Sequence, residues 1–482
     1  MRIKLADIRA ELPPLVHLAL PLIAGELGWV SMSLVDTIML GHLPNSALAM
    51  SAAALAQVLF NTFCFGVGGV LLGLDTLISQ ALGSKQQEEA NRWLLHGVVM
   101  ALALSALLIA IFAVTPVLLF RLPVDHAILA LAVPAMQGLN YGTLPLMLYF
   151  TFRRYLQAHH HGRPIAFALI SANLVNVAGD WLLIFGHHWT FAAHSYGIPA
   201  FGVTGSSWST SFARLYLMAV VLFAIWRADR KHHYGLIEGL RQRILPHIAG
   251  VADQPSSWLS RIEYQHLRKL FLLGAPAGAS IFVEIAIFAL VTSLIATFGR
   301  LPLAGHEVAL QCASTTFMVP LAISAATSVR VGHAIGRLRI GLGTTANVIA
   351  AGWSGIGTGA AFMLCASVLL LAVPRHIAHI FTPDPGVIAA AIPLLLIAAG
   401  FQFFDGVQIT ATGALRGAGN THAPFITQLV CYWFIGMPLG VFLGFHEKLG
   451  AAGLWGGLLI ALTCGAFAMC FFWRRFTHTF TA

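Results

Sequence analysis

Charged side chains are scarce in this sequence, since only 9% of its 482 residues are Asp, Glu, Lys or Arg. An ordinary soluble domain carries about 25%. A soluble enzyme of one to three domains could not cover its surface with so few charges, so the composition excludes that class. Hydrophobic residues make up 58% of the chain, which excludes disordered and fibrous proteins as well. The composition therefore predicts a multi-pass membrane protein.

Cysteine pairs and enzyme motifs are also missing. The six cysteines all fall in apolar segments without a CxxC pair, so we expect neither a disulfide frame nor a zinc site. The sequence contains no GxxxxGK[ST], HExxH, GxGxxG or serine-triad motif, so we expect neither ATP-driven transport nor an enzyme, and no cofactor. No cleavable signal peptide is evident. We attribute the net charge of +9 to membrane topology rather than to nucleic-acid binding.

Long apolar runs fill almost the whole chain. A hydrocarbon core about 30 Å thick needs about 20 apolar residues per spanning helix. One long polar stretch, residues 227–269, separates two halves, which we expect to be six-helix lobes over residues 1–226 and 270–482 joined by a cytoplasmic linker. The twelve predicted spans lie near 14–40, 46–72, 94–120, 127–151, 164–186, 202–226, 270–298, 303–327, 343–373, 387–413, 423–445 and 451–473.

Basic residues predict the orientation of these spans. With the N-terminus in the cytoplasm, 22 of the 27 Lys and Arg residues fall in cytoplasmic segments. The outer loops hold Arg121, Arg300, Arg375 and Lys448, and Arg214 lies within the sixth span. We therefore expect both termini in the cytoplasm.

The two halves resemble each other in sequence. LGHLPNSA at 40–47 matches FGRLPLAG at 298–305, and SQALG at 79–83 matches GHAIG at 332–336. Pro134 and Pro393 are related by an offset of 259 residues. Because each half has an even number of spans, both halves have the same orientation, and the pseudo-two-fold axis runs along the membrane normal.

Acidic residues outnumber basic ones within the spans, with Arg214 as the single base. An ionisable residue at bilayer depth is costly and is a functional hypothesis by default. The excess of acids predicts a cavity that prefers cations. The seven acids in or at the edge of spans are Glu26, Asp36, Asp75, Asp180, Glu284, Glu307 and Asp405; interface positions are favoured for Asp75 and Glu307.

Polar residues form a stripe in the fifth span. Asn173, Asn176 and Asp180 are spaced i, i+3 and i+7, which places them on one helical face. With Asp36 from the first span they would offer oxygen ligands to a small cation or hold a carboxyl that carries a proton. The alternative is a stripe that only fastens helices together.

The second half contains a similar arrangement. Asp405, Gln408 and Thr412 share the spacing i, i+3 and i+7, and Glu284 stands alone in an apolar run. A lone Glu needs a proton, a metal ion or a distant base. The histidine tracts are more consistent with solvated loops than with metal sites; they are His159, His160 and His161, and His187, His188 and His194.

Several segments together resemble the multidrug and toxic compound extrusion (MATE) family, in its NorM-like branch. They include ALPLIAGELGWVSMSLVDTIMLGHL (19–43), GLDTLISQALG (73–83), GAPAGASIFVEIAIFA (274–289) and FQFFDGVQITATGALRGAGNT (401–421). The resemblance covers nearly the whole chain, in order and in both halves. It implies a cation-driven exporter of organic cations, drugs and dyes, with lobes that alternate access to the two sides of the membrane.

The resemblance also implies site residues. Asp36, Asn176 and Asp180 match the family's first-lobe cation or proton site, and Thr210 matches a hydroxyl on the sixth helix. Glu284 and Asp405 match second-lobe acids associated with sodium, although Phe401 stands where a Tyr is common. The sequence leaves Na⁺ and H⁺ both open as the coupling ion. Asp36, Glu284 and Asp405 are also the candidates for the substrate cavity.

Two other functions are alternatives to a secondary active exporter. A flippase for lipid-linked precursors shares the twelve-helix plan, but its anionic pyrophosphate substrate should need several basic groups, and Arg214 alone fits poorly. A membrane-embedded enzyme should show clustered acids, histidines or cysteines at an interface, and the sequence shows no such cluster. We therefore expect an exporter in the cytoplasmic (inner) membrane, acting as a monomer.

Overall fold

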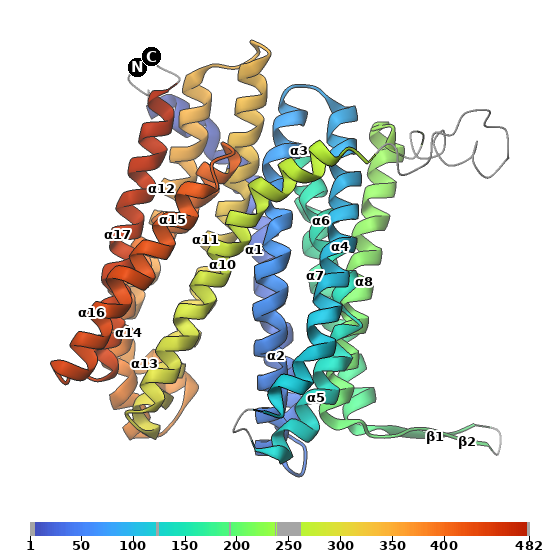
Figure 1. Cartoon of the computed structure of the whole chain (residues 1–482), viewed down its shortest axis with the longest axis vertical. Helices are drawn as coiled ribbons and strands as arrows, with labels where there is room; N and C mark the ends of the chain where they lie inside the picture. Colours follow the sequence, from blue (N-terminus) through green and yellow to red (C-terminus); the bar gives the residue numbers. More distant parts are fainter. Residues whose placement is uncertain (1–4, 122–124, 192–193, 237, 239–261, 480–482) are drawn as a thin grey trace. The chain divides into compact units, whose positions relative to one another are not determined.

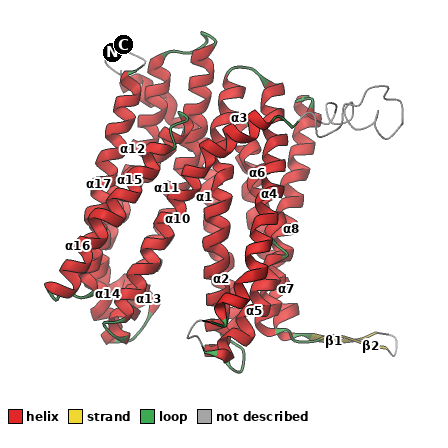
Figure 2. Cartoon of the chain, in the orientation of Figure 1, coloured by secondary structure: helices red, strands yellow, loops and turns green. Residues whose placement is uncertain are grey.

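The computed structural model describes residues 5–121, 125–191, 194–236, 238 and 262–479, and most of these are helical (Figures 1 and 2). Within the bilayer a helix satisfies the hydrogen bonds of its own backbone groups. The long Ala- and Leu-rich runs of this chain favour such helices. The helices of the first half are α1 (Leu5–Leu40), α2 (Ser46–Gly68), the 3₁₀ turn η1 (Gly69–Leu72), α3 (Gly73–Gly83), α4 (Gln87–Leu119), α5 (His126–Asn140), α6 (Thr143–Ala158), α7 (Gly162–Phe185) and α8 (Gly202–His232).

The second half continues the same pattern. Two π-helical stretches flank the short helix α16. The elements of the second half are α10 (Tyr264–Ala296), α11 (Arg300–Arg339), α12 (Thr345–Ala372), α13 (Pro374–Phe381), α14 (Pro385–Gly417), α15 (His422–Leu429), η3 (Val430–Gly436), α16 (Met437–Val441), η4 (Phe442–His446) and α17 (Ala451–His478).

The number of membrane spans agrees with the sequence. Among the described residues, 11 helical segments are long and apolar enough to cross a membrane, or up to 12 when α5 and α6 form one span. These two helices are bent by 44° relative to each other, at Tyr141 and Gly142. This confirms an all-α multi-pass membrane fold of about twelve spans.

A β-hairpin interrupts the helical pattern between α7 and α8, where the sequence indicated only a long loop. Its strands β1 (His187–Phe191) and β2 (His194–Ile198) are antiparallel, with His187 paired to Ile198 (Figure 1). The hairpin was missed because its residues show neither a clear apolar alternation nor a tight-turn dipeptide.

The chain forms two compact units, each described here by itself. Unit 1 comprises residues 1–23, 75–85 and 273–482, and unit 2 comprises residues 24–74 and 86–272. Helices α1 and α10 each contribute to both units. The two lobes at 1–226 and 270–482 were predicted from the internal sequence repeat, and this division of the chain stays a prediction.

Small residues let the helices approach closely within each unit. In unit 2, α7 packs along α8, and a Cβ on Gly179 would lie 2.5 Å from the Ser209 hydroxyl. In unit 1, α14 packs against α11, α12 and α17, and a Cβ on Gly413 would lie 2.3 Å from the Ser324 carbonyl oxygen. Close backbone approach of this kind is typical of helix pairs in membranes. It holds the polar side chains described next at fixed positions.

Candidate functional site

Two buried carboxyl groups meet in unit 2. Asp36 lies on α1 and Asp180 on α7, and both side chains are almost fully shielded from solvent. The two carboxyl groups interact with each other through their side chains. Neither oxygen of Asp180 has a hydrogen-bond donor in the described part of the chain. Since bare buried carboxylates are expensive, the pair needs a cation or a proton.

Donors surround the Asp36 carboxyl on one side. Thr210 on α8 donates through Oγ1 to Asp36 Oδ2 at 3.3 Å, and Gln57 on α2 donates through Nε2 to the same oxygen at 3.4 Å. The Asn176 side chain also contributes to the electrostatic surroundings of Asp36. The structure thus brings together Asp36, Asn176, Asp180 and Thr210, and their role in coupling stays a prediction. Gln57 was missed because a Gln in an otherwise apolar span carries no spacing signal.

The α7 stripe divides into two parts with different contacts. Asn176 donates to the Ser209 hydroxyl at 3.2 Å, and Ser209 donates to the Asn176 carbonyl at 2.8 Å, which fixes α8 beside the carboxyl pair. Asn173 instead donates to the carbonyl of Gly28 on α1 at 2.9 Å. Asn173 therefore fastens two helices together, while Asn176 belongs to the carboxyl cluster.

The second pair of acids lies in unit 1. Glu284 on α10 is half-buried and Asp405 on α14 is buried, and their charges interact. Both also interact electrostatically with the buried phenol of Tyr432, which accepts a hydrogen bond from Gln408 Nε2 at 3.0 Å. The structure therefore places a phenol oxygen near these acids. It comes from η3 rather than from position 401.

Tyr432 is a candidate residue that the sequence reasoning missed. Phe401, at the expected position of a phenol, packs its ring against Trp455 with centroids 5.5 Å apart. Tyr432 lies 27 residues beyond Asp405 on another element, so no local spacing relates the two. The π-helical turns of η3 and the neighbouring glycine contacts with α17 position it.

Two other acids already have basic partners. Glu26 on α1 forms an ion pair with Arg153, which is buried within α6. Asp75 on α3 lies 3.8 Å from Arg416 of α14. The sequence-based count of seven acids to one base is therefore wrong, because Arg153 was assigned to a loop. Of the other five acids, Glu307 is exposed on α11, and four form two pairs whose coupling roles stay a prediction.

The histidine tract after α6 is less exposed than a solvated loop would be. The His159 ring packs against the rings of Tyr155 and Tyr234 at 4.3 and 4.4 Å. Burial lowers the pKa of His159 to about 4 and also lowers the pKa of His161. Among the described residues no group of three or more His, Cys, Asp or Glu side chains is arranged to hold a metal ion.

The outer histidines fall at the β-hairpin. The His187 ring contacts Trp181 on α7, with centroids 3.6 Å apart. The side chains of His188 and His194 lie outside the described residues.

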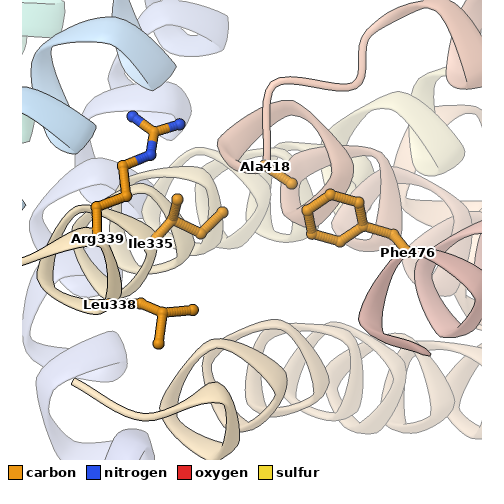
Figure 3. A pocket seen from close by; sticks show the side chains of 5 residues that line it. All are labelled: Ile335, Leu338, Arg339, Ala418 and Phe476. Carbon is orange, nitrogen blue, oxygen red and sulfur yellow. The ribbon is translucent and has the colours of Figure 1, made fainter. Parts of the chain in front are cut away.

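Two hollows lie away from both acid pairs. One, of about 360 Å³, is formed by the ends of α11, α14 and α17, where the Phe476 ring faces Ile335 (Figure 3). The other, of about 500 Å³, lies beside α13 and the start of α14. Neither is lined by a predicted site residue. The first is lined by Ile335, Leu338, Arg339, Ala418 and Phe476.

A comparison with family models identifies the group to which the sequence belongs. The MatE model matches residues 21–182 and 276–442, which is more than half of the chain and covers both acid pairs. The chain belongs to the MatE family. This agrees with the resemblance seen in the sequence.

Curated relatives of this MatE-family chain carry multidrug names. It is 30% identical to the probable multidrug resistance protein NorM of Geobacillus kaustophilus, over 96% of this chain and 95% of that protein. It is also 30% identical to the multidrug resistance protein NorM of Vibrio cholerae, over 95% and 94%. Its identity to the multidrug resistance protein PmpM of Pseudomonas aeruginosa is 30% as well, over 96% and 91%.

Solved structures share the fold at low sequence identity. The eukaryotic MATE transporter AtDTX14 matches with a TM-score of 0.79 and 18% identity, over 98% of both chains. A transporter of the MOP superfamily from Pyrococcus furiosus, described as having a binding pocket of reverse polarity that suggests a different function, matches with a TM-score of 0.80 and 16% identity, over 98% of this chain and 97% of that one. The shared fold therefore does not decide the charge of the binding site.

Proposed function

We propose that this protein is a secondary active multidrug efflux transporter that exports organic cations in exchange for H⁺ or Na⁺ by alternating access. The observation that carries the proposal is the buried and interacting pair Asp36 and Asp180, which lies on two helices long and apolar enough to cross a membrane. A second pair, Glu284 and Asp405, lies in the other unit. A carboxyl that must be neutralised binds either a coupling ion or a cationic substrate, and competition between the two is the basis of exchange.

The multidrug names of the curated relatives support the substrate class. Because the fold also accommodates a reversed pocket polarity, the sign of the substrate rests on this chain's own acids rather than on the fold. We further propose that the protein acts as a monomer in the bacterial inner membrane with both termini in the cytoplasm, because Lys and Arg concentrate in the segments assigned to that side. It needs no catalytic residues for this role.

Transport into proteoliposomes tests the proposal directly. Purified protein is reconstituted, and ethidium movement is followed under an imposed proton gradient, then under a sodium gradient at constant pH. We expect one of the gradients to drive ethidium against its own gradient. Protein with Asp36→Asn and Asp405→Asn together serves as the matched inactive control.

Two outcomes would contradict the proposal. Transport of a matched anionic dye in preference to ethidium would contradict the assignment of organic cations. Equal ethidium movement with the double variant would show that the acid pairs take no part in coupling.

A further inference from the structure

Arg214 on α8 is a buried cation that forms no ion pair among the described residues. Its Nη1 donates to the Leu139 carbonyl at 3.4 Å, and its guanidinium stacks over the ring of Phe60 at 4.3 Å. Its Nε has no hydrogen-bond acceptor in the described part of the chain. The side chain does not extend along its helix to the interface, because it is almost fully buried. A guanidinium in such surroundings requires negative charge nearby.

The carboxyl group whose charge interacts with Arg214 belongs to the first acid pair. Thr210, which donates to Asp36, lies one helical turn before Arg214 on the same face of α8. The charge of Arg214 interacts with Asp36 from α1 and with the Cys64 thiol from α2. Asp180 is the acid that α7 adds to this group.

A glycine in the bend after α5 makes this position possible. A Cβ on Gly142 would lie 2.9 Å from Arg214 Cδ and 2.8 Å from the Ser211 hydroxyl. Any larger residue at 142 would displace the arginine. From α5 itself Arg214 receives a backbone carbonyl, that of Leu139, and no charged side chain. The cation is therefore seated beside the acid pair without an ion-pair contact to it.

We propose that Arg214 limits the first acid pair to one added positive charge, and so makes it selective for monovalent over divalent organic cations. Two carboxylates carry two negative charges, and the fixed guanidinium balances one. One proton, one sodium ion or one monovalent organic cation then completes the balance. A divalent organic cation would leave an unbalanced positive charge in a buried site. The inference rests on the proposed export of organic cations and concerns the charge of the substrate.

Two probes of nearly the same size and shape separate charge from fit. These are 1-methyl-4-phenylpyridinium, a monocation, and 1,1′-dimethyl-4,4′-bipyridinium, a dication. Their dissociation constants are measured by equilibrium dialysis on purified full-length protein, in a Glu284→Gln/Asp405→Asn background that silences the second pair. We expect the monocation to bind more tightly. Arg214→Gln should shift the ratio of dissociation constants towards the dication by about tenfold, since a fixed charge at close range acts on each probe in proportion to its charge.

Two further variants distinguish charge from a merely structural role. Arg214→Lys keeps the charge and should keep the original ratio. Asp180→Asn removes one negative charge and should weaken monocation binding, whereas Asp180→Asn with Arg214→Gln should restore it. Each variant is compared at equal monodispersity on size exclusion.

The outcomes separate the inference from the proposed function. An unchanged ratio in folded Arg214→Gln would overturn the inference, and so would a failure of the double variant to recover monocation binding. If Arg214→Gln does not fold, the Asp180→Asn and Arg214→Lys measurements decide: a shifted ratio in Arg214→Lys overturns the inference. If wild-type protein with its second pair intact binds neither probe, export of organic cations is itself wrong.

Discussion

The two acid pairs of this protein are built from the same number of carboxyl groups but from different partners. Asp36 accepts hydrogen bonds from side chains on α2 and α8, and its charge interacts with a fixed guanidinium, that of Arg214. Glu284 and Asp405 lie near the neutral phenol of Tyr432, and neither forms an ion pair with a base among the described residues. The first pair is therefore partly balanced in charge, whereas the second depends on ions or substrate for its balance.

The internal repeat explains part of this difference. The offset of 258 residues that relates Gly41 to Gly299 also relates Glu26 to Glu284. Glu26 is neutralised by Arg153. The offset of 259 within α5–α6 and α14 relates Arg153 to Thr412, so the second half offers a hydroxyl where the first half has a base. Equivalent acids thus differ in role because their partners differ.

The largest effect should follow from removing the carboxyl group of Asp36, which accepts the hydrogen bonds described for the first pair. Asp36→Asn should abolish drug resistance and ethidium transport, because a neutral amide cannot exchange a proton for a cation. Resistance is measured in cells at matched expression, with Asn173→Ala as a control that alters the neighbouring stripe outside the carboxyl cluster. Normal resistance in Asp36→Asn cells would remove the first pair from the mechanism.

The ion pair of Glu26 and Arg153 should instead affect the stability of the protein. Arg153→Met leaves Glu26 buried without its partner and should cost about 3–5 kcal/mol of stability. Adding Glu26→Gln should recover much of this loss, since no bare charge remains. Thermal unfolding in detergent measures both. If the double variant unfolds as early as Arg153→Met alone, the ion pair is not the cause.

The second pair should govern part of the coupling. Glu284→Gln and Asp405→Asn, singly and together, should reduce the response of transport to external sodium or pH by about tenfold while Asp36-dependent transport persists. Fully additive losses from the two single variants would contradict a shared site. Transport is measured in proteoliposomes at fixed membrane potential. The ion whose response disappears identifies what the second pair binds.

The phenol of Tyr432 distinguishes sodium from protons at that pair. If sodium binds there, Tyr432→Phe should weaken sodium stimulation several-fold, because one oxygen ligand is lost and sodium prefers several. If only protons act there, the effect on transport should be small, since the loss is one hydrogen bond to Gln408. Tyr216→Phe is the matched control, because it removes one phenol hydrogen bond, to Ser171, in the other unit.

The smallest effect concerns the ends of α6 and α14. The His159 ring packs against Tyr234 after α6. Ala418, which the offset of 259 residues relates to His159, instead lines a cavity after α14 (Figure 3). Burial lowers the pKa of His159 to about 4, from about 6.5 in an unfolded chain. As the pH falls, the unfolded state binds the proton first, so the stability is complete above about pH 6.5 and decreases towards pH 4.

His159→Asn should flatten this pH dependence of thermal unfolding, whereas His160→Asn, at the exposed neighbour, should leave it unchanged. An equal effect of the two variants would show that burial of His159 is not the cause.

Composition and periodicity by themselves determined the membrane class, the number of spans and the acids to inspect. Apolar runs of about 20 residues have few alternatives to a spanning helix, because backbone groups must be paired in lipid. The spacing of Asn176 and Asp180 likewise placed them on one face, since a helix fixes that geometry locally.

Only the tertiary structure decided which acids form an ion pair with a basic residue. Glu26 and Asp36 both lie in the first span, and nothing in that span shows which of the two has a basic partner. Arg153 lies 127 residues from Glu26, and Tyr432 lies on a different element from Asp405, so the helix packing alone brings these partners together. Long-range pairing of this kind leaves no periodic trace in the sequence, which is why the base at 153 and the phenol at 432 were missed.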